Sequence, residues 1–188
     1  MANRLQSSAM SREGGYSEET KEALVVEQSY VTNNNAERER LRATIARLND
    51  ADLSKSIGHG WTVAVTLAHL AFWDRLVLEW LEDWEQRGFR TAEALYEWDQ
   101  GVLLPSRDAW RTRNDEMLSV WLAMPTREAA REAITVAETL DQKIETLDPD
   151  LVEAILSSSL WGFNQRRLLD RSLHRREHLD EIDRALAG

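Results

Sequence analysis

Apolar side chains recur every three or four residues along most of the chain, which is the spacing of helices with one buried face. The clearest such segment is TVAVTLAHLAFWDRLVLEWLEDWEQRG, which starts at Thr62 and stops at Gly88. Its apolar stripe at helical spacing contains Val65, His69, Phe72, Trp73, Leu76, Trp80 and Trp84. The pattern therefore predicts a helix over 62–88 with His69 in the middle of an apolar face.

The same spacing predicts further long helices on both sides of this segment. A first helix is expected over about 18–48. The weak helix formers TNNN lie within it, and an interruption of the helix at TNNN is an alternative. A third helical region starts at Ser106, meets Pro125 as a kink or junction, and resumes from about 126. The last helix is expected over about 165–187. Shorter helical pieces are predicted at AEALYEW and after DPD.

The connections between these helices complete the prediction of the fold. No run alternates Val, Ile or Thr with polar residues as a strand would, and SIGHGW is interpreted as a glycine-containing turn. Long helices joined by short connections are typical of bundles. The predicted fold class is all-α, an antiparallel four-helix bundle with short additional helices in the connections. Residues 1–16 are polar and lack periodicity, so we expect a mobile tail at 1–16 and a single bundle domain over 17–188.

Charge and composition exclude several classes of function. The 188 residues carry a formal net charge of −10, with a pI of about 4.9, which disfavours nucleic-acid phosphates and anionic lipid head groups as partners. The chain has no cysteine, so disulfides, thiolate metal ligands and a cysteine nucleophile are excluded. No stretch approaches the roughly 20 apolar residues of a membrane span, and MANRLQSSAMSREGGYS lacks the apolar core of a signal peptide. We expect a cytoplasmic protein that binds neither nucleic acid nor membranes.

Two of the chain's four histidines stand four residues apart in RSLHRREHLDEI. At that spacing on a helix, His174 and His178 project from one face with Cβ atoms roughly 6 Å apart, close enough to share one ion. A bare pair of this kind also arises by chance in charged helices. A lone histidine on an apolar face, such as His69, is more often a core residue, but a bundle brings inward-facing side chains of separate helices together. His59, in the GHG turn, is interpreted as an ordinary loop residue.

If the histidines form a metal site, its ligands can be named. His69, His174 and His178 are the candidate ligands, and three neutral imidazoles leave at least one coordination position free, as in catalytic rather than structural metal sites. Zinc is the first expectation, and an imidazole site also accepts nickel, iron or manganese.

Two stretches resemble the DinB-like helical bundles. GWTVAVTLAHLAFWDRLVLEW is similar to the second helix of that superfamily, with its Trp, a Thr that starts the helix and AHLAFWD, and HRREHLDEIDRAL is similar to the last helix. The resemblance covers about residues 20–188 and implies a four-helix bundle, often dimeric. Many members bind a divalent metal through one histidine of the second helix and two of the last, and His69, His174 and His178 stand at these positions.

One branch of the superfamily resembles this chain in GW before the second helix and in REHLDEI near the end. It contains the N-terminal domain of mycothiol-dependent maleylpyruvate isomerase and S-transferases that use low-molecular-weight thiols, which implies a thiol cosubstrate and a homodimer. Two departures limit the inference. The additional C-terminal domain of the isomerase has no counterpart here, and the second helix of the family often carries a charged residue where this chain has VAVTL. We expect the fold and the histidine triad to transfer, and the isomerase reaction not to.

Aromatic residues supply candidates for a pocket. Eight tryptophans are many for this length, and most are expected in the core. Trp73, Trp110 and Trp121 are the candidates for a pocket wall. Asn114 interrupts the stripe of Trp110, Met117 and Trp121, so one interpretation is that it faces the pocket, where it is a candidate catalytic residue. The alternatives are a hydrogen bond within the core and a helix rotated slightly outward.

Charged residues near the histidines are candidates for supporting roles. Arg171, one turn before His174, is a second candidate catalytic residue that would contact an anionic substrate or a thiol carboxylate, with a solvated ion pair as the alternative. Asp74, Asp170 and Glu181 would orient the imidazoles, as metal-ligating histidines require, with surface charges as the alternative.

Two functions of different classes remain open at this point. The first is a metal-dependent enzyme that activates a low-molecular-weight thiol, or water, for transfer to a small electrophilic substrate or for its isomerisation. The second is a non-catalytic bundle that binds or sequesters a small molecule, with a structural metal or none.

Overall fold

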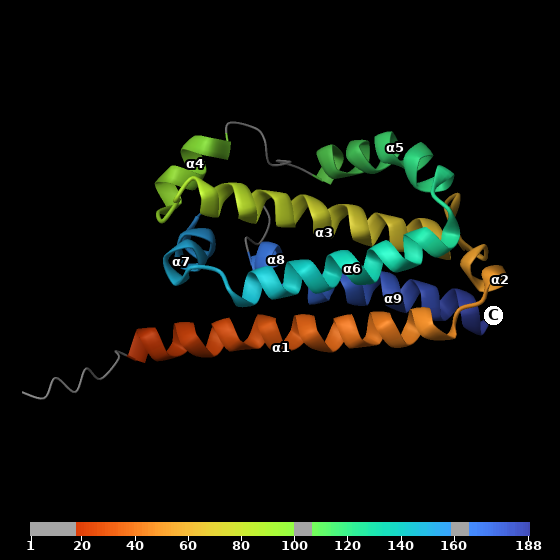
Figure 1. Cartoon of the computed structure of the whole chain (residues 1–188), viewed down its shortest axis with the longest axis horizontal. Helices are drawn as coiled ribbons and strands as arrows, with labels where there is room; N and C mark the ends of the chain where they lie inside the picture. The colour runs from red at the N-terminus through yellow and green to blue at the C-terminus, as the bar shows by residue number, and fades with distance from the viewer. Residues whose placement is uncertain (1–17, 100–106, 159–165) are drawn as a thin grey trace, which may run out of the picture.

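The computed structural model describes residues 18–99, 107–158 and 166–188, and the tail predicted at 1–16 lies outside this range. The elements in chain order are α1 (Glu18–Arg47), α2 (Asp50–Leu53), β1 (Ser56–Gly58), β2 (Trp61–Thr62), α3 (Val63–Gln86), α4 (Ala92–Asp99), α5 (Arg107–Ala123), α6 (Thr126–Glu145), α7 (Pro149–Ser157), α8 (Arg166–Leu169) and α9 (Ser172–Ala187) (Figure 1). The prediction of an all-α helical bundle is confirmed.

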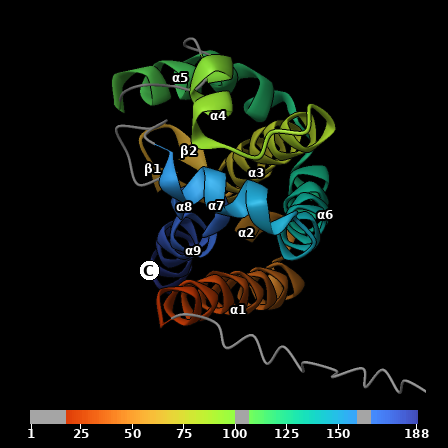
Figure 2. The same cartoon turned by 90° about the vertical axis from the view of Figure 1, so that its left-hand side faces the viewer.

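The bundle consists of α1, α3, α6 and α9, each of which packs against two of the others (Figure 2). Helices α1 and α9 run in one direction, and α3 and α6 run in the other (Figure 1). The predicted antiparallel packing is present at the α1/α6 and α3/α9 contacts, whereas α3/α6 and α1/α9 are parallel neighbours. Two ion pairs show that α1 and α6 are antiparallel. Arg38 of α1 pairs with Asp141 of α6, and Arg42, further along α1, pairs with Glu138, which comes earlier in α6.

The connection from α3 to α6 accounts for these directions. Helix α5 returns along the outer side of α3, so that α6 begins at the end of the bundle where α3 began (Figure 1). Pro125 is the junction at which the chain reverses, and α5 and α6 are separate helices. Its carbonyl accepts hydrogen bonds from the backbone N–H groups of Glu128 and Ala129 at 2.9 and 3.0 Å. A proline fits this position because the first residues of a helix have no intrahelical partner for their N–H groups.

The TNNN segment does not interrupt α1. Asn34 is 1% exposed and supports a break in a different part of the chain, between α8 and α9. Its side-chain amide donates to the carbonyl of Leu169 at 2.7 Å and accepts from the backbone N–H of Ser172 at 2.9 Å. These two groups lack helical partners because the last helix, predicted as continuous over 165–187, is divided at Asp170 and Arg171. The asparagine therefore stabilises the point at which α9 begins.

A short two-stranded hairpin replaces the turn expected at SIGHGW. Strands β1 and β2 are three and two residues long, too short for a strand to be recognised by alternation. Gly58, His59 and Gly60 form the tip with φ of 101°, 53° and 79°, and the two glycines adopt these values without a steric penalty. Thr62 follows directly and caps α3 by accepting from the backbone N–H of Val65 at 3.3 Å. The hairpin thus holds Trp61 beside the start of α3.

Helix α3 is the most deeply buried element of the bundle. Leu67 and Leu81 are fully buried, and each such leucine contributes about 1.5–3 kcal/mol of transfer free energy relative to an exposed position. Within the part of the chain that the structure describes, no helix combines the length and the apolar character needed to cross a bilayer. The face of α3 that turns towards α9 carries His69.

Candidate metal centre

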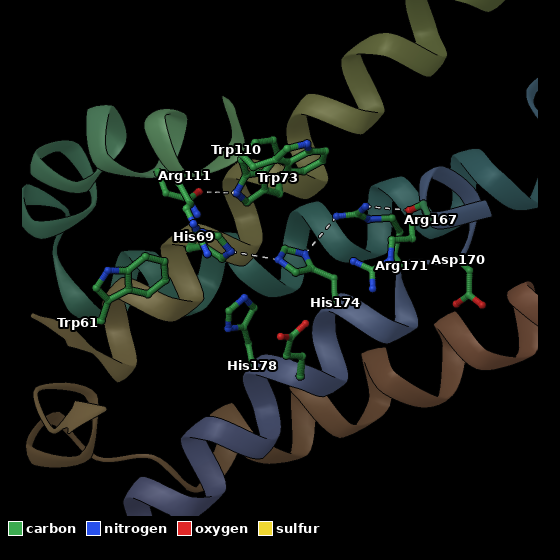
Figure 3. A pocket seen from close by; sticks show the side chains of 12 residues that line it. Trp61, His69, Trp73, Trp110, Arg111, Arg167, Asp170, Arg171, His174 and His178 are labelled. Atoms are coloured by element: carbon green, nitrogen blue, oxygen red, sulfur yellow. Dashed lines mark hydrogen bonds between the residues drawn. The ribbon is translucent and has the colours of Figure 1, made fainter. Parts of the chain in front are cut away.

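The three candidate ligands lie together between α3 and α9. His69 and His174 approach with their Nε2 atoms 3.0 Å apart. One ring nitrogen from each of His69, His174 and His178 lies within 4.8 Å of the others. Figure 3 shows His69 pointing from α3 towards His174 and His178, which project from successive turns of α9. His69 is buried and the other two are half-buried, so the cluster is accessible from the side of α9.

Aromatic rings enclose the cluster on the side of α3. The ring of Trp61 lies 4.9 Å from that of His69 and stacks on His178 at 6.4 Å. Trp121 meets His69 edge to face at 5.1 Å and an interplanar angle of 88°. Trp121 is 2% exposed, so it lies behind the cluster. These rings keep water away from the His69 side and lower the local dielectric constant.

The second nitrogen of each imidazole has a different environment. His178 Nδ1 lies 2.8 Å from the Glu181 carboxylate, the contact that orients a ligating histidine. His174 Nδ1 lies 3.2 Å from Nη2 of Arg171. His69 Nδ1 is buried and has no hydrogen-bond partner among the described residues. Of the three carboxylates expected to orient imidazoles, Glu181 contacts one directly, whereas Asp74 and Asp170 contact other groups.

A cavity of about 390 Å³ opens onto the histidines. Its described lining residues are Trp61, His69, Trp73, Trp110, Arg111, Asn114, Arg167, Asp170, Arg171, His174, Glu177 and His178 (Figure 3). Trp73 and Trp110 stack at 4.4 Å and form one wall. Asn114 lines the cavity and also accepts a hydrogen bond from Trp73 Nε1 at 3.0 Å, so the position at the pocket and the hydrogen bond are combined. Trp121, expected in the wall, is not among the lining residues and packs behind Trp61 and His69.

Comparison with known proteins identifies the family. The sequence matches the DinB superfamily over residues 34–180, which is most of the chain. The chain belongs to the DinB superfamily. No curated protein and no solved structure gave a match. The matched region contains His69, His174 and His178, so the cluster lies inside the DinB homology region.

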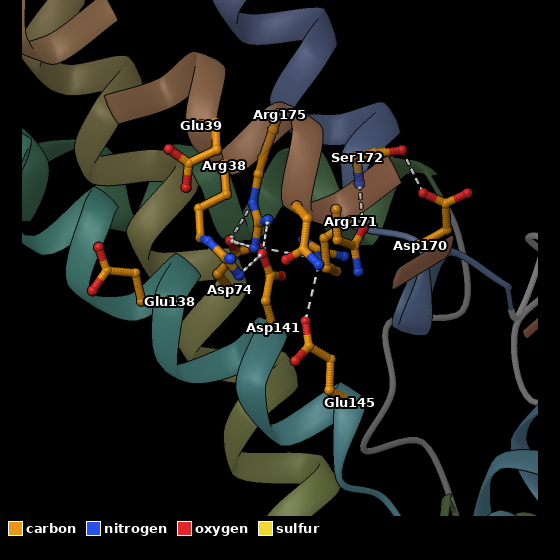
Figure 4. Close-up of polar contacts among 12 residues, drawn as sticks. Arg38, Glu39, Asp74, Glu138, Asp141, Glu145, Asp170, Arg171, Ser172 and Arg175 are labelled. Atoms are coloured by element: carbon orange, nitrogen blue, oxygen red, sulfur yellow. Dashed lines mark hydrogen bonds and ion pairs between the residues drawn. The ribbon is translucent and has the colours of Figure 1, made fainter. Parts of the chain in front are cut away.

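A buried network of charges fixes the start of α9 in this DinB bundle (Figure 4). Asp74 accepts from Nε of Arg171 at 2.9 Å and from Nη2 of Arg175 at 2.8 Å. Arg175 is 0% exposed and also donates to Asp141 at 2.8 Å, and Arg38 of α1 donates to the same carboxylate at 3.0 Å. Asp74 and Arg171 are therefore buried, which corrects the alternatives of a surface charge and a solvated ion pair.

The network keeps the Asp74 carboxylate charged. Burial alone would raise the pKa of Asp74, but the charges of Arg175 and Arg171 and their hydrogen bonds together hold that pKa below its usual value. Arg171 thereby has a fixed partner on α3, and its guanidinium is held beside His174. Asp170 lies in the break itself, next to Arg171, and accepts from the Ser172 hydroxyl.

His69 and His174 are held in the neutral form. Burial lowers the pKa of His69 and of His174 well below the ordinary value, and the neighbouring imidazoles and Arg171 lower each pKa further. Both rings are therefore neutral at pH 7, the form in which histidine binds metal ions. Three imidazoles from two helices, two of them held neutral and the third oriented by Glu181, fit the divalent ion that the family resemblance implies.

Metal-free protein is expected to lose stability as the pH falls below about 6.5, the ordinary pKa of histidine. His69 and His174 take up protons there in the unfolded chain but stay neutral in the folded protein, so acid favours unfolding. Each contributes up to about 1.4 kcal/mol per pH unit, and the free energy of unfolding should fall by about 1–3 kcal/mol between pH 7 and about 5.5. Urea unfolding of the metal-free protein at several pH values measures this loss.

The matched variants are His69→Gln and His59→Gln. The first should flatten the pH profile, because it removes a buried imidazole, and the second should leave it unchanged, because His59 is exposed at the hairpin tip. A wild-type profile that stays flat down to about pH 5.5 would contradict burial of neutral imidazoles.

Several residues of the site were missed by the sequence analysis. Trp61 was noted only as part of a motif, although its place directly before the helix that carries His69 could have marked it. Arg175 is spaced by four and seven residues from the buried Leu179 and Ile182, a signal of the inward face that its charge concealed. Arg111 and Arg167 carry no sequence signal for the cavity, because their positions depend on how α5 and α8 pack.

Proposed function

We propose that His69, His174 and His178 hold a divalent metal ion, with zinc as the first candidate, and that the protein is a metal-dependent enzyme acting on a small electrophilic substrate. The observation that supports this most directly is the convergence of three imidazoles, two of them held neutral, at the mouth of an aromatic cavity. An ion with a free position lowers the pKa of a thiol or of water, so that the nucleophile is available at neutral pH. The thiol would be a low-molecular-weight cosubstrate, since the chain has no cysteine of its own.

The cavity supplies the remaining requirements for such a reaction. Trp110, which stacks on the buried Trp73, gives the cavity an apolar side against which a planar substrate would pack. Asn114 offers its remaining amide group as a donor, while its carbonyl oxygen is engaged by Trp73. Trp61 covers the imidazoles and excludes bulk water. In thiol transfer, a carbon–sulfur bond forms at the electrophilic carbon and the leaving group departs with its electron pair.

A second function is supported by a different feature of the same geometry. The 3.0 Å separation of the His69 and His174 Nε2 atoms is also that of a hydrogen bond. Two hydrogen-bonded neutral imidazoles beside an aromatic cavity would suit a protein that binds a small apolar molecule and carries no metal. Thiol transfer stays a prediction of the first function. The homodimer and the cytoplasmic location stay predictions under either function.

Cobalt-substituted protein separates these possibilities. Adding N-acetylcysteine to the Co²⁺-loaded protein should produce a new near-ultraviolet absorption band, because a thiolate that reaches the ion changes its spectrum. N-acetylserine should produce none, and the band should be absent in His174→Ala. If Co²⁺ binds but its spectrum does not change with N-acetylcysteine, the thiol reaction is contradicted and water remains the candidate nucleophile. Protein that binds no ion would contradict the enzyme proposal and leave the apolar-ligand function.

A further inference from the structure

The polarity of one hydrogen bond constrains how the histidine cluster can bind an ion. An arginine guanidinium only donates hydrogen bonds, and Arg171 Nη2 lies 3.2 Å from His174 Nδ1. Nδ1 is therefore the acceptor, and the proton of this neutral ring lies on Nε2. That Nε2–H in turn faces His69 Nε2 at 3.0 Å, which accepts it. We call the cluster closed when these two hydrogen bonds are present, from Arg171 to His174 and from His174 to His69.

Arg171 is held firmly in the position that imposes this arrangement. Its Nε donates to Asp74 at 2.9 Å, and its Nη1 donates to the carbonyl of Arg167 at 2.9 Å. The residue is 4% exposed. Two of its donor nitrogens thus have protein acceptors, and the third nitrogen, Nη2, has His174 as its partner.

Ion binding would turn His174 Nδ1 from a hydrogen-bond acceptor into a donor. If His174 Nε2 binds an ion, the ring proton has to lie on Nδ1, where the N–H of Arg171 already points. Two donors then face each other, and Nη2 loses its acceptor. Ligating histidines ordinarily donate this N–H to a carboxylate, carbonyl or water, as His178 can to Glu181. Arg171 therefore opposes ion binding unless Nη2 finds another acceptor.

The cavity points to the chemistry of that acceptor. Arg171 lines the cavity together with Arg111 and Arg167, and the ion pair of Arg111 with Asp108 spans 3.6 Å at the surface. Asp170 and Glu177 also line it, and the Asp170 carboxylate is engaged by Ser172. A divalent ion would add two positive charges. A ligand with a carboxylate on a flat apolar body would accept hydrogen bonds from the arginines through the carboxylate and pack against Trp110.

We propose that Arg171 couples the histidine cluster to a carboxylate ligand: it donates to His174 when the cluster is closed, and to the carboxylate of a planar small molecule when the cluster holds an ion. This inference rests on the proposed metal function. Arg171 is a positioning residue with respect to the ion and a binding residue with respect to the ligand. Ion and carboxylate then bind with positive, reciprocal cooperativity.

The first test needs no variant and no metal. Long-range ¹H–¹⁵N NMR correlations of the imidazole rings report which nitrogen carries the proton. In metal-free wild-type protein at neutral pH, His174 should be protonated on Nε2 and bare on Nδ1. A proton on Nδ1 of His174 would overturn the proposal at its first step, whatever the protein binds.

The second test measures Zn²⁺ affinity by chelator competition, with benzoate or with its neutral counterpart benzamide. In the wild type, benzoate should tighten Zn²⁺ binding by about fivefold or more, and benzamide should not. Arg171→Gln should bind Zn²⁺ about tenfold more tightly without benzoate, because glutamine can accept the Nδ1 proton, and should lose the benzoate effect. Arg113→Gln is the matched control on α5, since Arg113 pairs with Glu116 at the surface, and it should behave as the wild type.

The outcomes separate this inference from the proposed function. Zn²⁺ binding with no benzoate effect would overturn the coupling and leave the metal site intact. An equal benzoate effect in wild type and Arg171→Gln would also overturn it, because the carboxylate would then act on the ion alone. Absence of Zn²⁺ binding in the wild type would overturn the metal function and the coupling together, and the NMR result would still decide the hydrogen bond between Arg171 and His174.

Discussion

Replacing His69 with alanine is expected to lower Zn²⁺ affinity by more than about 100-fold, since changes to groups that merely orient ligands already cost 10–100-fold. His69 supplies the cluster's contribution from α3, and its Nε2 lies 3.0 Å from that of His174. Without it, two imidazoles on one helix remain, and their spacing alone provides a weak chelate. Chelator competition on the purified variant measures the loss.

The control for this experiment is His59→Ala. His59 is exposed at the tip of the β1/β2 hairpin, and its removal should leave Zn²⁺ affinity within about threefold of the wild type, the variation expected of a surface substitution. Circular dichroism should show that both variants keep their helices. A His69→Ala protein that binds Zn²⁺ as tightly as the wild type would restrict the site to α9.

The second large effect concerns stability. Asp74→Asn is expected to lower the free energy of unfolding by about 3–5 kcal/mol, the cost of breaking a buried ion pair from one side. Arg175 is 0% exposed and shares its charge between Asp74 and Asp141. An asparagine would turn an N–H₂ group towards one of two guanidinium groups that only donate. Urea unfolding of the metal-free proteins gives the difference.

Asp83→Asn is the matched control on the same helix. Asp83 pairs with Arg87 at 2.7 Å at the surface of α3, and exposed pairs of this kind contribute about 0.3–0.5 kcal/mol. A loss of less than about 1 kcal/mol in Asp74→Asn would show that Arg175 finds other partners, and that the network does not hold α9 in place.

Local periodicity predicted the parts of the fold that depend on local geometry. The helix that carries His69, the projection of His174 and His178 from one face, and the presence of a bundle all follow from 3.6 residues per turn. The directions of the helices do not, because they depend on α5 and on the reversal at Pro125. The sequence left that proline open as a kink or a junction.

The polar interior was the least predictable part. Asn34 belongs to a segment of weak helix formers, and its role in bridging the α8/α9 break depends on Leu169 and Ser172, which lie 135 and 138 positions away. Arg175 lies in HRREH, where a charged run indicates solvent. Its burial follows from carboxylates on α3 and α6 that no local pattern connects to it. Contacts of such sequence separation become visible only when the helices are placed in space.

Elemental analysis shows whether the three histidines bind an ion, when protein purified without an affinity histidine tag is measured beside its His174→Ala variant. We expect about one zinc, nickel, iron or manganese ion per chain in the wild type, and much less in the variant, because one of three imidazole ligands is gone. Wild-type protein that contains none of these metals, and takes up none on incubation with their salts, would contradict the proposed metal site. The three histidines would then form a hydrogen-bonded cluster beside an aromatic cavity.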